Sequence, residues 1–205
     1  MESVSIYKWI AVLFIFLFLS HPSNGQIKDS YLIYASSKVT VGNYIGGGIT
    51  LDVIRNNKYS LGMGYYEQEK KPGNLPSDYE LGIFNLFTFG LGGVRDNIKT
   101  ASFTLGKVFY NKSNSAIRYN LKGGITYSVI KTPTNWVWHN YGLFSLENYT
   151  YDYEKNNEIG MLINPTIDFP FLKFLGFCAG PYVFMNPQAI SYGIELTTLI
   201  GYVRK

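Results

Sequence analysis

The segment AIRYNLKGGITYSV (116–129) alternates between apolar and polar residues with a period of two. One parity holds Ile117, Tyr119, Leu121, Ile125, Tyr127 and Val129, and the other holds Arg118, Asn120, Lys122, Thr126 and Ser128. Successive side chains of a β-strand point to opposite faces, so this pattern predicts a strand with one apolar and one polar face. A soluble sheet would turn the apolar face toward a core. A membrane barrel would turn it toward lipid and direct Arg118 and Lys122 into a narrow polar interior.

Seven other segments carry a similar alternation, in part weaker, and no comparable run has helical spacing. They span 30–39, 43–54, 58–69, 98–110, 158–169, 176–185 and 190–203. The 18 Tyr, 14 Phe and 21 Gly residues fit aromatic-rich strands with glycines at turns and close approaches. The sequence therefore predicts an all-β fold of eight strands.

The connections between these strands alternate in length. Those near 56–57, 112–115 and 171–175 are short, and those spanning 70–97 and 132–157 are long. Outer-membrane barrels have short periplasmic turns and long external loops, and eight strands place both chain ends on the short-turn side. We therefore predict an eight-stranded antiparallel up-and-down transmembrane β-barrel.

The first 25 residues predict a cleavable signal peptide. Lys8 supplies a positive charge, SNG (23–25) supplies small residues for cleavage, and the apolar run at 9–20 is shorter than the roughly 20 residues of a membrane span. We therefore expect a signal peptide at 1–25 and one barrel domain at 26–205, exported to the bacterial outer membrane. The single cysteine cannot form an intramolecular disulfide, and the net charge of +4, spread without a basic cluster, gives no sign of nucleic-acid binding.

Charged residues predict the strand register. Rotating the strand at 116–129 by one residue would turn Arg118 and Lys122 toward hydrocarbon, at roughly 2–4 kcal/mol each near the midplane. In the favoured register, the interior collects Asp52, Arg118, Lys122, Asp168 and Glu195. An eight-stranded interior is just wide enough to be filled by side chains, so these charges are expected to pair into a plug. The alternative is that they are solvent-exposed charges of a soluble sandwich, whose large apolar faces would have to share one core.

Four segments resemble those of small outer-membrane β-barrel proteins of the Bacteroidetes. They are SNGQ (23–26), PSDY (76–79), NYTYDYEKNNEIGMLINPTIDFPF (148–171) and GIELTTLIGYVRK (193–205). The resemblance implies an outer-membrane barrel in contact with membrane lipid, and it implies no particular activity. It also implies that the barrel-assembly machinery reads the last strand during insertion, with Tyr202 as the aromatic residue near its end.

His139 is the only histidine outside the predicted signal peptide. With Ser145 or Glu147 it could serve a lipid-modifying enzyme at the external rim, but the spacing alone defines no triad. We therefore predict a non-enzymatic protein without catalytic residues. One histidine, one cysteine and acids on separate strands also predict no metal site and no cofactor.

Aromatic residues gather in the two long connections. Tyr149, Tyr151 and Tyr153 share the parity that faces lipid lower in their strand, and they are predicted to form an interfacial girdle. The candidate contacts for an unknown external ligand or protein are Phe84, Phe87, Phe89, Trp136 and Trp138. The leading hypothesis is a barrel whose external loops have interaction or structural roles. The second is binding or transport of a small hydrophobic molecule at the aromatic-lined mouth.

Overall fold

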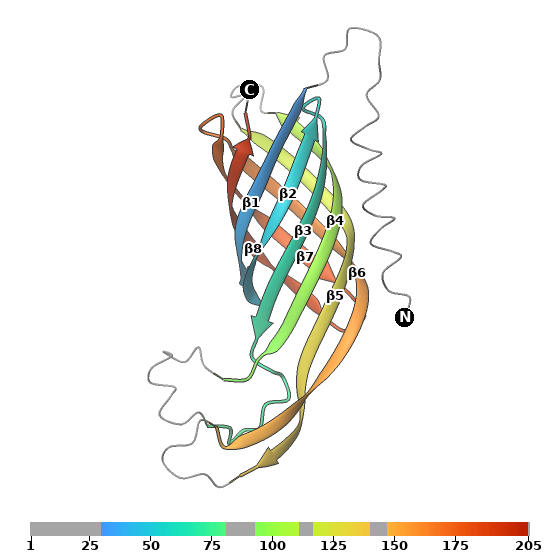
Figure 1. Ribbon diagram of the computed structural model, residues 1–205, viewed down its shortest axis with the longest axis vertical. Coiled ribbons are helices and arrows are strands. Elements are labelled where there is room, and N and C mark those ends of the chain that lie inside the picture. Colours follow the sequence, from blue (N-terminus) through green and yellow to red (C-terminus); the bar gives the residue numbers. More distant parts are fainter. Residues whose placement is uncertain (1–29, 81–92, 111–116, 140–146, 205) are drawn as a thin grey trace, which may run out of the picture.

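The computed structural model describes residues 30–80, 93–110, 117–139 and 147–204. They form one closed antiparallel barrel in which each strand pairs with its neighbour in sequence and β8 pairs with β1 (Figure 1). The strands are β1 (Tyr31–Gly42), β2 (Ile45–Arg55), β3 (Tyr59–Lys70), β4 (Asp96–Tyr110), β5 (Arg118–Trp138), β6 (Tyr149–Phe169), β7 (Leu175–Met185) and β8 (Ile190–Tyr202). The predicted fold of eight antiparallel strands is confirmed. The predicted signal peptide lies outside the described residues.

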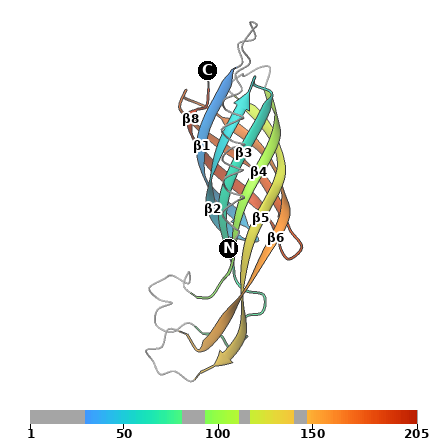
Figure 2. The ribbon, with the colours of Figure 1, turned by 45° about the vertical axis from the view of Figure 1, so that its right-hand side comes forward.

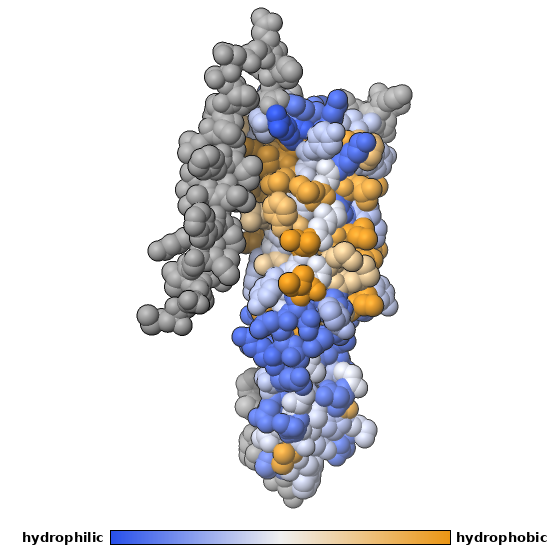
Figure 3. Space-filling model, turned by 90° about the vertical axis from the view of Figure 1, so that its right-hand side faces the viewer, coloured by the Kyte–Doolittle hydropathy of each residue, from blue (hydrophilic) through white to orange (hydrophobic). Residues whose placement is uncertain are grey.

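The barrel wall turns its apolar side chains outward. Ile125 on β5 is 62% exposed, and its partners in register, Phe103 on β4 and Met161 on β6, are exposed as well. The alternate residues Thr126 and Ser128 are buried in the interior. Figure 3 shows the apolar zone that results on one side of the barrel. Apolar side chains outside and polar side chains inside are what a lipid environment favours, and closure gives every strand two neighbours within the barrel.

No helix of the described residues is long and apolar enough to cross a membrane.

Exposed aromatic residues flank the apolar zone at both ends. Tyr65 and Tyr127 face outward in the half of the barrel that carries the long connections. In the register both are paired with Ala101 of β4, one from each side. The exposed rings near the opposite end are Tyr31, Tyr59, Phe109, Tyr119, Phe169, Phe177 and Tyr202. Amphipathic rings favour the boundary between membrane and water, so these two sets occupy the positions expected of interfacial girdles.

Beyond the barrel, β5 and β6 continue together as a two-stranded extension (Figures 1 and 2). The pairing reaches Trp138 and Tyr149, after a bulge between Thr134 and Val137. The prediction that 132–157 forms a loop is therefore wrong for most of that range. On β5 the segment 132–135 shows no apolar–polar contrast and so gave no strand signal, whereas on β6 the tyrosines at 149, 151 and 153 alternate with polar residues, a signal that was available.

The extension also corrects the predicted aromatic girdle. Tyr149, Tyr151 and Tyr153 belong to the extension, beyond the charged pair of positions Lys131 and Lys155. Their parity is continuous with the outer wall, but they lie outside the apolar zone. The prediction that these three tyrosines form the girdle is wrong.

Short turns close the end of the barrel at which β1 begins and β8 ends (Figure 1). Asn56 and Asn57 connect β2 to β3 with φ angles of 52° and 55°, and Lys58 N donates to Arg55 O at 3.0 Å. Two successive residues with positive φ match the type I′ turn, whose twist suits an antiparallel hairpin and which favours asparagine. The opposite end carries two further short connections, at 43–44 and 186–189, besides the two long ones.

A lysine placed on the outer wall should reveal which exposed surface meets lipid. We expect Ile125→Lys to lower the free energy of unfolding from lipid vesicles by about 2–4 kcal/mol, because the charge would face hydrocarbon. Val137→Lys is the matched control, since Val137 is similarly exposed on the same strand but belongs to the extension. Urea titration of both variants measures the difference, and equal losses would contradict this membrane boundary.

Candidate functional site

Among the described residues, three ion pairs shorter than 3 Å lie buried in the interior of the barrel. Arg118 Nε lies 2.9 Å from Asp168 Oδ2, and Lys122 Nζ lies 2.7 Å from Asp52 Oδ1. The fifth predicted charge, Glu195, accepts a bond of 2.9 Å from Lys38 Nζ. The structure thus places all five predicted interior charges inside the barrel and joins four of them into two pairs.

Lys38 is a buried interior cation that sequence reasoning missed. Its strand alternates weakly, because Leu32 and Tyr34 place apolar groups on the inner face while Ser37 places a polar one outside. The available signal was parity, since Ser36, Lys38 and Thr40 share the inner face. With Lys38 included, three bases meet three acids in these pairs, so their charges cancel.

Neighbouring polar groups hold the carboxylates in place. Thr50 Oγ1 donates to Asp52 Oδ2 at 2.8 Å, and Thr166 Oγ1 donates to Asp168 Oδ1 at 3.1 Å. Each threonine stands two residues before its acid, because positions i and i+2 of a strand share a face. These bonds satisfy the carboxylate oxygens that the ion pairs leave free, which a buried charge requires.

A glycine makes room for the central pair. A Cβ atom added to Gly62 would lie 2.7 Å from both Asp52 Oδ1 and Thr104 Oγ1. Even the smallest side chain at this position would therefore displace the carboxylate that binds Lys122. Gly62 is paired with Asp52 in the β2–β3 register, so the absence of a side chain at Gly62 leaves space for the Asp52 carboxylate.

Two apolar clusters share the interior with the ion pairs. The cluster nearer the chain ends contains Leu32, Tyr34, Ile54, Val108, Cys178, Leu199 and Val203. The cluster nearer the extension contains Tyr44, Ile98, Ile130, Leu162, Tyr182 and Phe184. The Arg118–Asp168 pair lies among residues of the first cluster, because Arg118 Nη1 donates to Val203 O at 2.7 Å and the guanidinium lies 5.5 Å from the centre of the Tyr34 ring.

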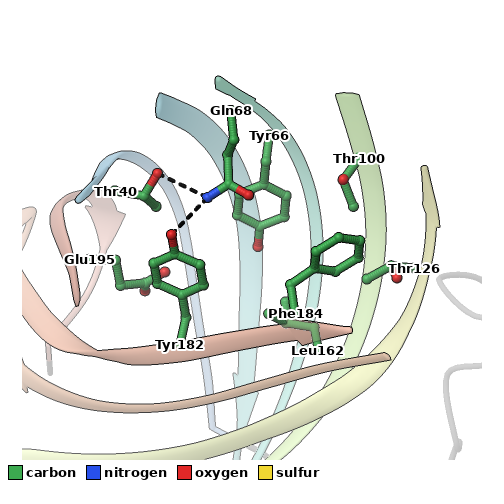
Figure 4. A pocket seen from close by; sticks show the side chains of 9 residues that line it. All are labelled: Thr40, Tyr66, Gln68, Thr100, Thr126, Leu162, Tyr182, Phe184 and Glu195. Atoms are coloured by element: carbon green, nitrogen blue, oxygen red, sulfur yellow. Dashed lines mark hydrogen bonds between the residues drawn. The ribbon is translucent and has the colours of Figure 1, made fainter. Parts of the chain in front are cut away.

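Little open space remains inside the described barrel. Figure 4 shows the cavity beside Tyr182 and Phe184, where Gln68 Nε2 donates to Thr40 Oγ1 at 3.1 Å and to Tyr182 Oη at 3.0 Å. This cavity measures about 20 Å³, and a second one beside Lys122 measures about 10 Å³. Volumes of this size hold about one water molecule each. They are too small to hold a hydrophobic solute, whereas the second hypothesis concerns binding or transport at the aromatic-lined mouth.

The first long connection docks onto the extension. Asn148 Nδ2 donates to Asp78 O at 2.7 Å, and its Oδ1 accepts from Glu80 N at 2.8 Å. Tyr149 Oη donates to Asp78 Oδ1 at 2.7 Å. The segments PSDY and NYTY, far apart in the sequence, therefore meet in one external structure. We call this structure the external head and define it as residues 74–80, 133–139 and 147–153.

Aromatic rings form the centre of the external head. Trp136 lies at centroid distances of 5.9 Å from Tyr79, 6.1 Å from Tyr149 and 5.1 Å from Tyr151. Tyr151 in turn meets Tyr153 edge to face at 5.4 Å. Edge-to-face and tilted pairs at these distances are favourable because the ring edge is positive and the face negative. The predicted contact Trp136 thus packs within the head, whereas Trp138 is largely exposed.

Burial favours the protonated phenols of Tyr79 and Tyr151. Loss of solvation raises the pKa of Tyr79 to about 12 and also raises the pKa of Tyr151. A raised pKa in the folded state means that the neutral form is favoured there. The resulting stability is fully present below the unfolded pKa of about 10 and is lost as the pH rises through about 12.

Several predicted residues remain without a shared site. Phe84, Phe87, Phe89 and Ser145 lie outside the described residues. His139 lies at the end of the extension rather than at the barrel rim, with Nε2 at 2.9 Å from Thr150 Oγ1. Within the described part of the chain, no three His, Cys, Asp or Glu side chains gather as a metal site would require.

Removing one member of the Asp52–Lys122 ion pair should leave the other charge buried without a partner. We expect Asp52→Asn to lower the free energy of unfolding by about 3–5 kcal/mol, because Lys122 would lose its partner. The double variant Asp52→Asn/Lys122→Met should recover most of this loss. Glu67→Gln is the control, since its pair with Lys99 is exposed and should contribute less than about 1 kcal/mol. A single variant as stable as the double variant would refute the pairing.

Asn148 should hold the first connection on the extension. We expect Asn148→Ala to speed hydrogen exchange and proteolysis of residues 74–80, because the variant loses two side-chain bonds to that segment. Asn156→Ala is the control, since the Asn156 side chain donates to Glu154 on its own strand. Similar exchange in both variants would show that the docking does not depend on Asn148.

The sequence matches no known protein family and no curated protein. Among solved structures, a major outer membrane protein from Thermus thermophilus is similar, with a TM-score of 0.58 and 10% identity over 84% of this chain and 99% of that one. Neisserial surface protein A gives a TM-score of 0.49 and 10% identity over 85% of this chain and 99% of that one. The N-terminal β-barrel domain of Pseudomonas aeruginosa OprF gives 0.48 and 9% over 83% and 98%. At 10% identity, the likeness to the Thermus thermophilus protein supports the fold alone, a closed antiparallel barrel.

Proposed function

We propose that the protein is a non-enzymatic, integral outer-membrane barrel that anchors an external interaction head and does not conduct. The observation that carries this proposal is the inverted wall, with exposed Ile, Leu and Phe outside and paired charges inside. In a water-soluble protein, these apolar side chains would have to be covered by a partner around the whole circumference of the barrel. Membrane lipid supplies that contact directly.

The closed interior supports an anchoring role rather than a transport role. An ion crossing the barrel would have to pass two apolar clusters and separate at least one buried pair. Separating a buried pair leaves an uncompensated charge, which is strongly unfavourable. The cavities of about 20 and 10 Å³ are far smaller than a pathway of solute size.

The external head is the part that we assign to interaction. Its aromatic cluster and docked connection make it an ordered surface on a rigid strand pair. Val137, Trp138 and Tyr153 are about half exposed on it. Tyrosine and tryptophan offer large contact areas at a low cost in side-chain entropy, which suits them to binding surfaces.

Membrane lipid and the barrel-assembly machinery are the partners that this proposal requires. The apolar wall would contact lipid throughout the life of the protein. The machinery would act during insertion, and β8, which closes the barrel against β1, ends with the exposed ring of Tyr202.

Planar-bilayer recording tests the non-conducting barrel. The refolded protein, shown to be inserted by a gel mobility that changes on heating, should give no stable channels above a protein-free bilayer. The physical reason is the paired and enclosed interior. Stable steps of the size that porins give would contradict this proposal, as would a mature protein that stays soluble without detergent.

A further inference from the structure

Two lysines face each other on the outer wall where the barrel passes into the extension. Lys131 on β5 and Lys155 on β6 are paired directly in the register, and Lys131 is exposed. Directly opposed residues have Cβ atoms about 4.5–5.5 Å apart, and like charges at such positions repel. The two residues therefore form a concentrated positive site that lowers the stability of the strand pair unless an anion binds there.

The nearby acids already have other partners. Glu67 binds Lys99 at 3.0 Å and accepts from Asn97 at 3.0 Å. Glu69 accepts from Asn97 at 3.2 Å and lies 3.9 Å from Arg95. In residues 30–80, 93–110, 117–139 and 147–204, no ion pair includes Lys131 or Lys155. Glu67 also attracts Lys131, but no ion pair within 4.0 Å joins these two residues in the described part of the chain. The two lysines can therefore still bind an external anion.

The position of the site points to a lipid. Moving along β5 and β6 toward the barrel, the next register pair is Ile130 with Asn156, then Val129 with Asn157, and two steps further Tyr127 with Ile159. Tyr127 belongs to the exposed aromatic set, and Ile159 is 73% exposed on the apolar wall. Figure 3 shows hydrophilic residues directly beyond the apolar zone. A molecule with its anionic group at the lysines would therefore lay its hydrocarbon along the barrel wall.

We propose that Lys131 and Lys155 bind the phosphate of a lipid headgroup in the external leaflet. The two ammonium groups can donate to different oxygens of one phosphate, which replaces their repulsion by two charge-assisted bonds. Lysines beside an anionic membrane surface gain from the attraction over a distance of about one Debye length. Asn157, two residues from Lys155 on the same strand, adds an amide donor near the same level. This inference rests on the proposed outer-membrane location, which fixes the leaflet that the site meets.

A lipid-binding measurement on the refolded protein in micelles tests the site. The probes are a bisphosphorylated lipid A, the same glycolipid without phosphate, and inorganic phosphate, and native mass spectrometry counts the bound molecules. We expect Lys131→Gln/Lys155→Gln to bind the phosphorylated lipid roughly tenfold more weakly than the unchanged protein. Lys58→Gln/Lys173→Gln is the matched control, because it removes the same charge at the opposite end of the barrel and should retain full binding.

The outcomes separate this inference from the proposed function. The site is supported if Lys131→Gln/Lys155→Gln loses affinity for the phosphorylated lipid while the control variant keeps it. The glycolipid without phosphate should then bind weakly to the unchanged protein and to this variant. Equal binding by both double variants overturns it, and so does equally tight binding of inorganic phosphate, which would mean that the acyl chains contribute nothing. In these cases the heat-dependent gel shift still reports an inserted barrel, so the proposed function stands. A protein that fails to insert at all removes both.

Discussion

Each of the three cations paired in the barrel interior faces a charge of the opposite sign, and this pairing constrains the rest of the structure. A buried ion without a partner costs several kcal/mol, so Lys38, Arg118 and Lys122 can enter the interior only where an acid meets them. The Lys122–Asp52 pair joins β5 to β2, which are not neighbouring strands. The Lys38–Glu195 pair joins β1 to β8, which meet only when the barrel closes. A slip of one residue on any of these strands would break a pair and also turn a charge toward lipid. Register, closure and the inverted wall are therefore consequences of one electrostatic requirement.

The barrel and the external head are stabilised by different interactions. Inside the apolar zone, side chains are selected for lipid on one face and for the paired interior on the other. In the external head, strand pairing continues without that selection, and the structure depends on aromatic packing around Trp136 and on the bonds between Asn148 and Asp78 or Glu80. The lysines at positions 131 and 155 stand at the boundary, between the paired interior and the packed head. The division explains why the barrel suits an anchor and why recognition is assigned to the parts outside it.

Sequence reasoning succeeded where the membrane imposes a pattern and failed where it does not. The alternation at 116–129 predicted the inner face of β5 and the interior position of Arg118 and Lys122, because lipid and interior select opposite residue types. Lys38 escaped notice because apolar Leu32 and Tyr34 share its inner face, so the alternation in β1 is blurred. The β5 half of the extension was missed because Thr132, Pro133 and Thr134 carry no period-two contrast. The β6 half did carry the signal, since Tyr149, Tyr151 and Tyr153 alternate with polar residues. The contact of Tyr79 with Trp136 joins segments that only the folded hairpin brings together, so no local pattern could have indicated it.

The central claim is that the apolar wall faces lipid while the interior is sealed from it. The most direct measurement is methyl NMR of isoleucine-labelled protein in lipid nanodiscs whose acyl chains carry a paramagnetic label at mid-chain. The account predicts strong broadening of the outward methyl groups of Ile49, Ile125, Ile163 and Ile194 and little broadening of the buried methyl groups of Ile54, Ile98 and Ile130. Equal broadening of the two sets, or stronger broadening of the buried set, would contradict it.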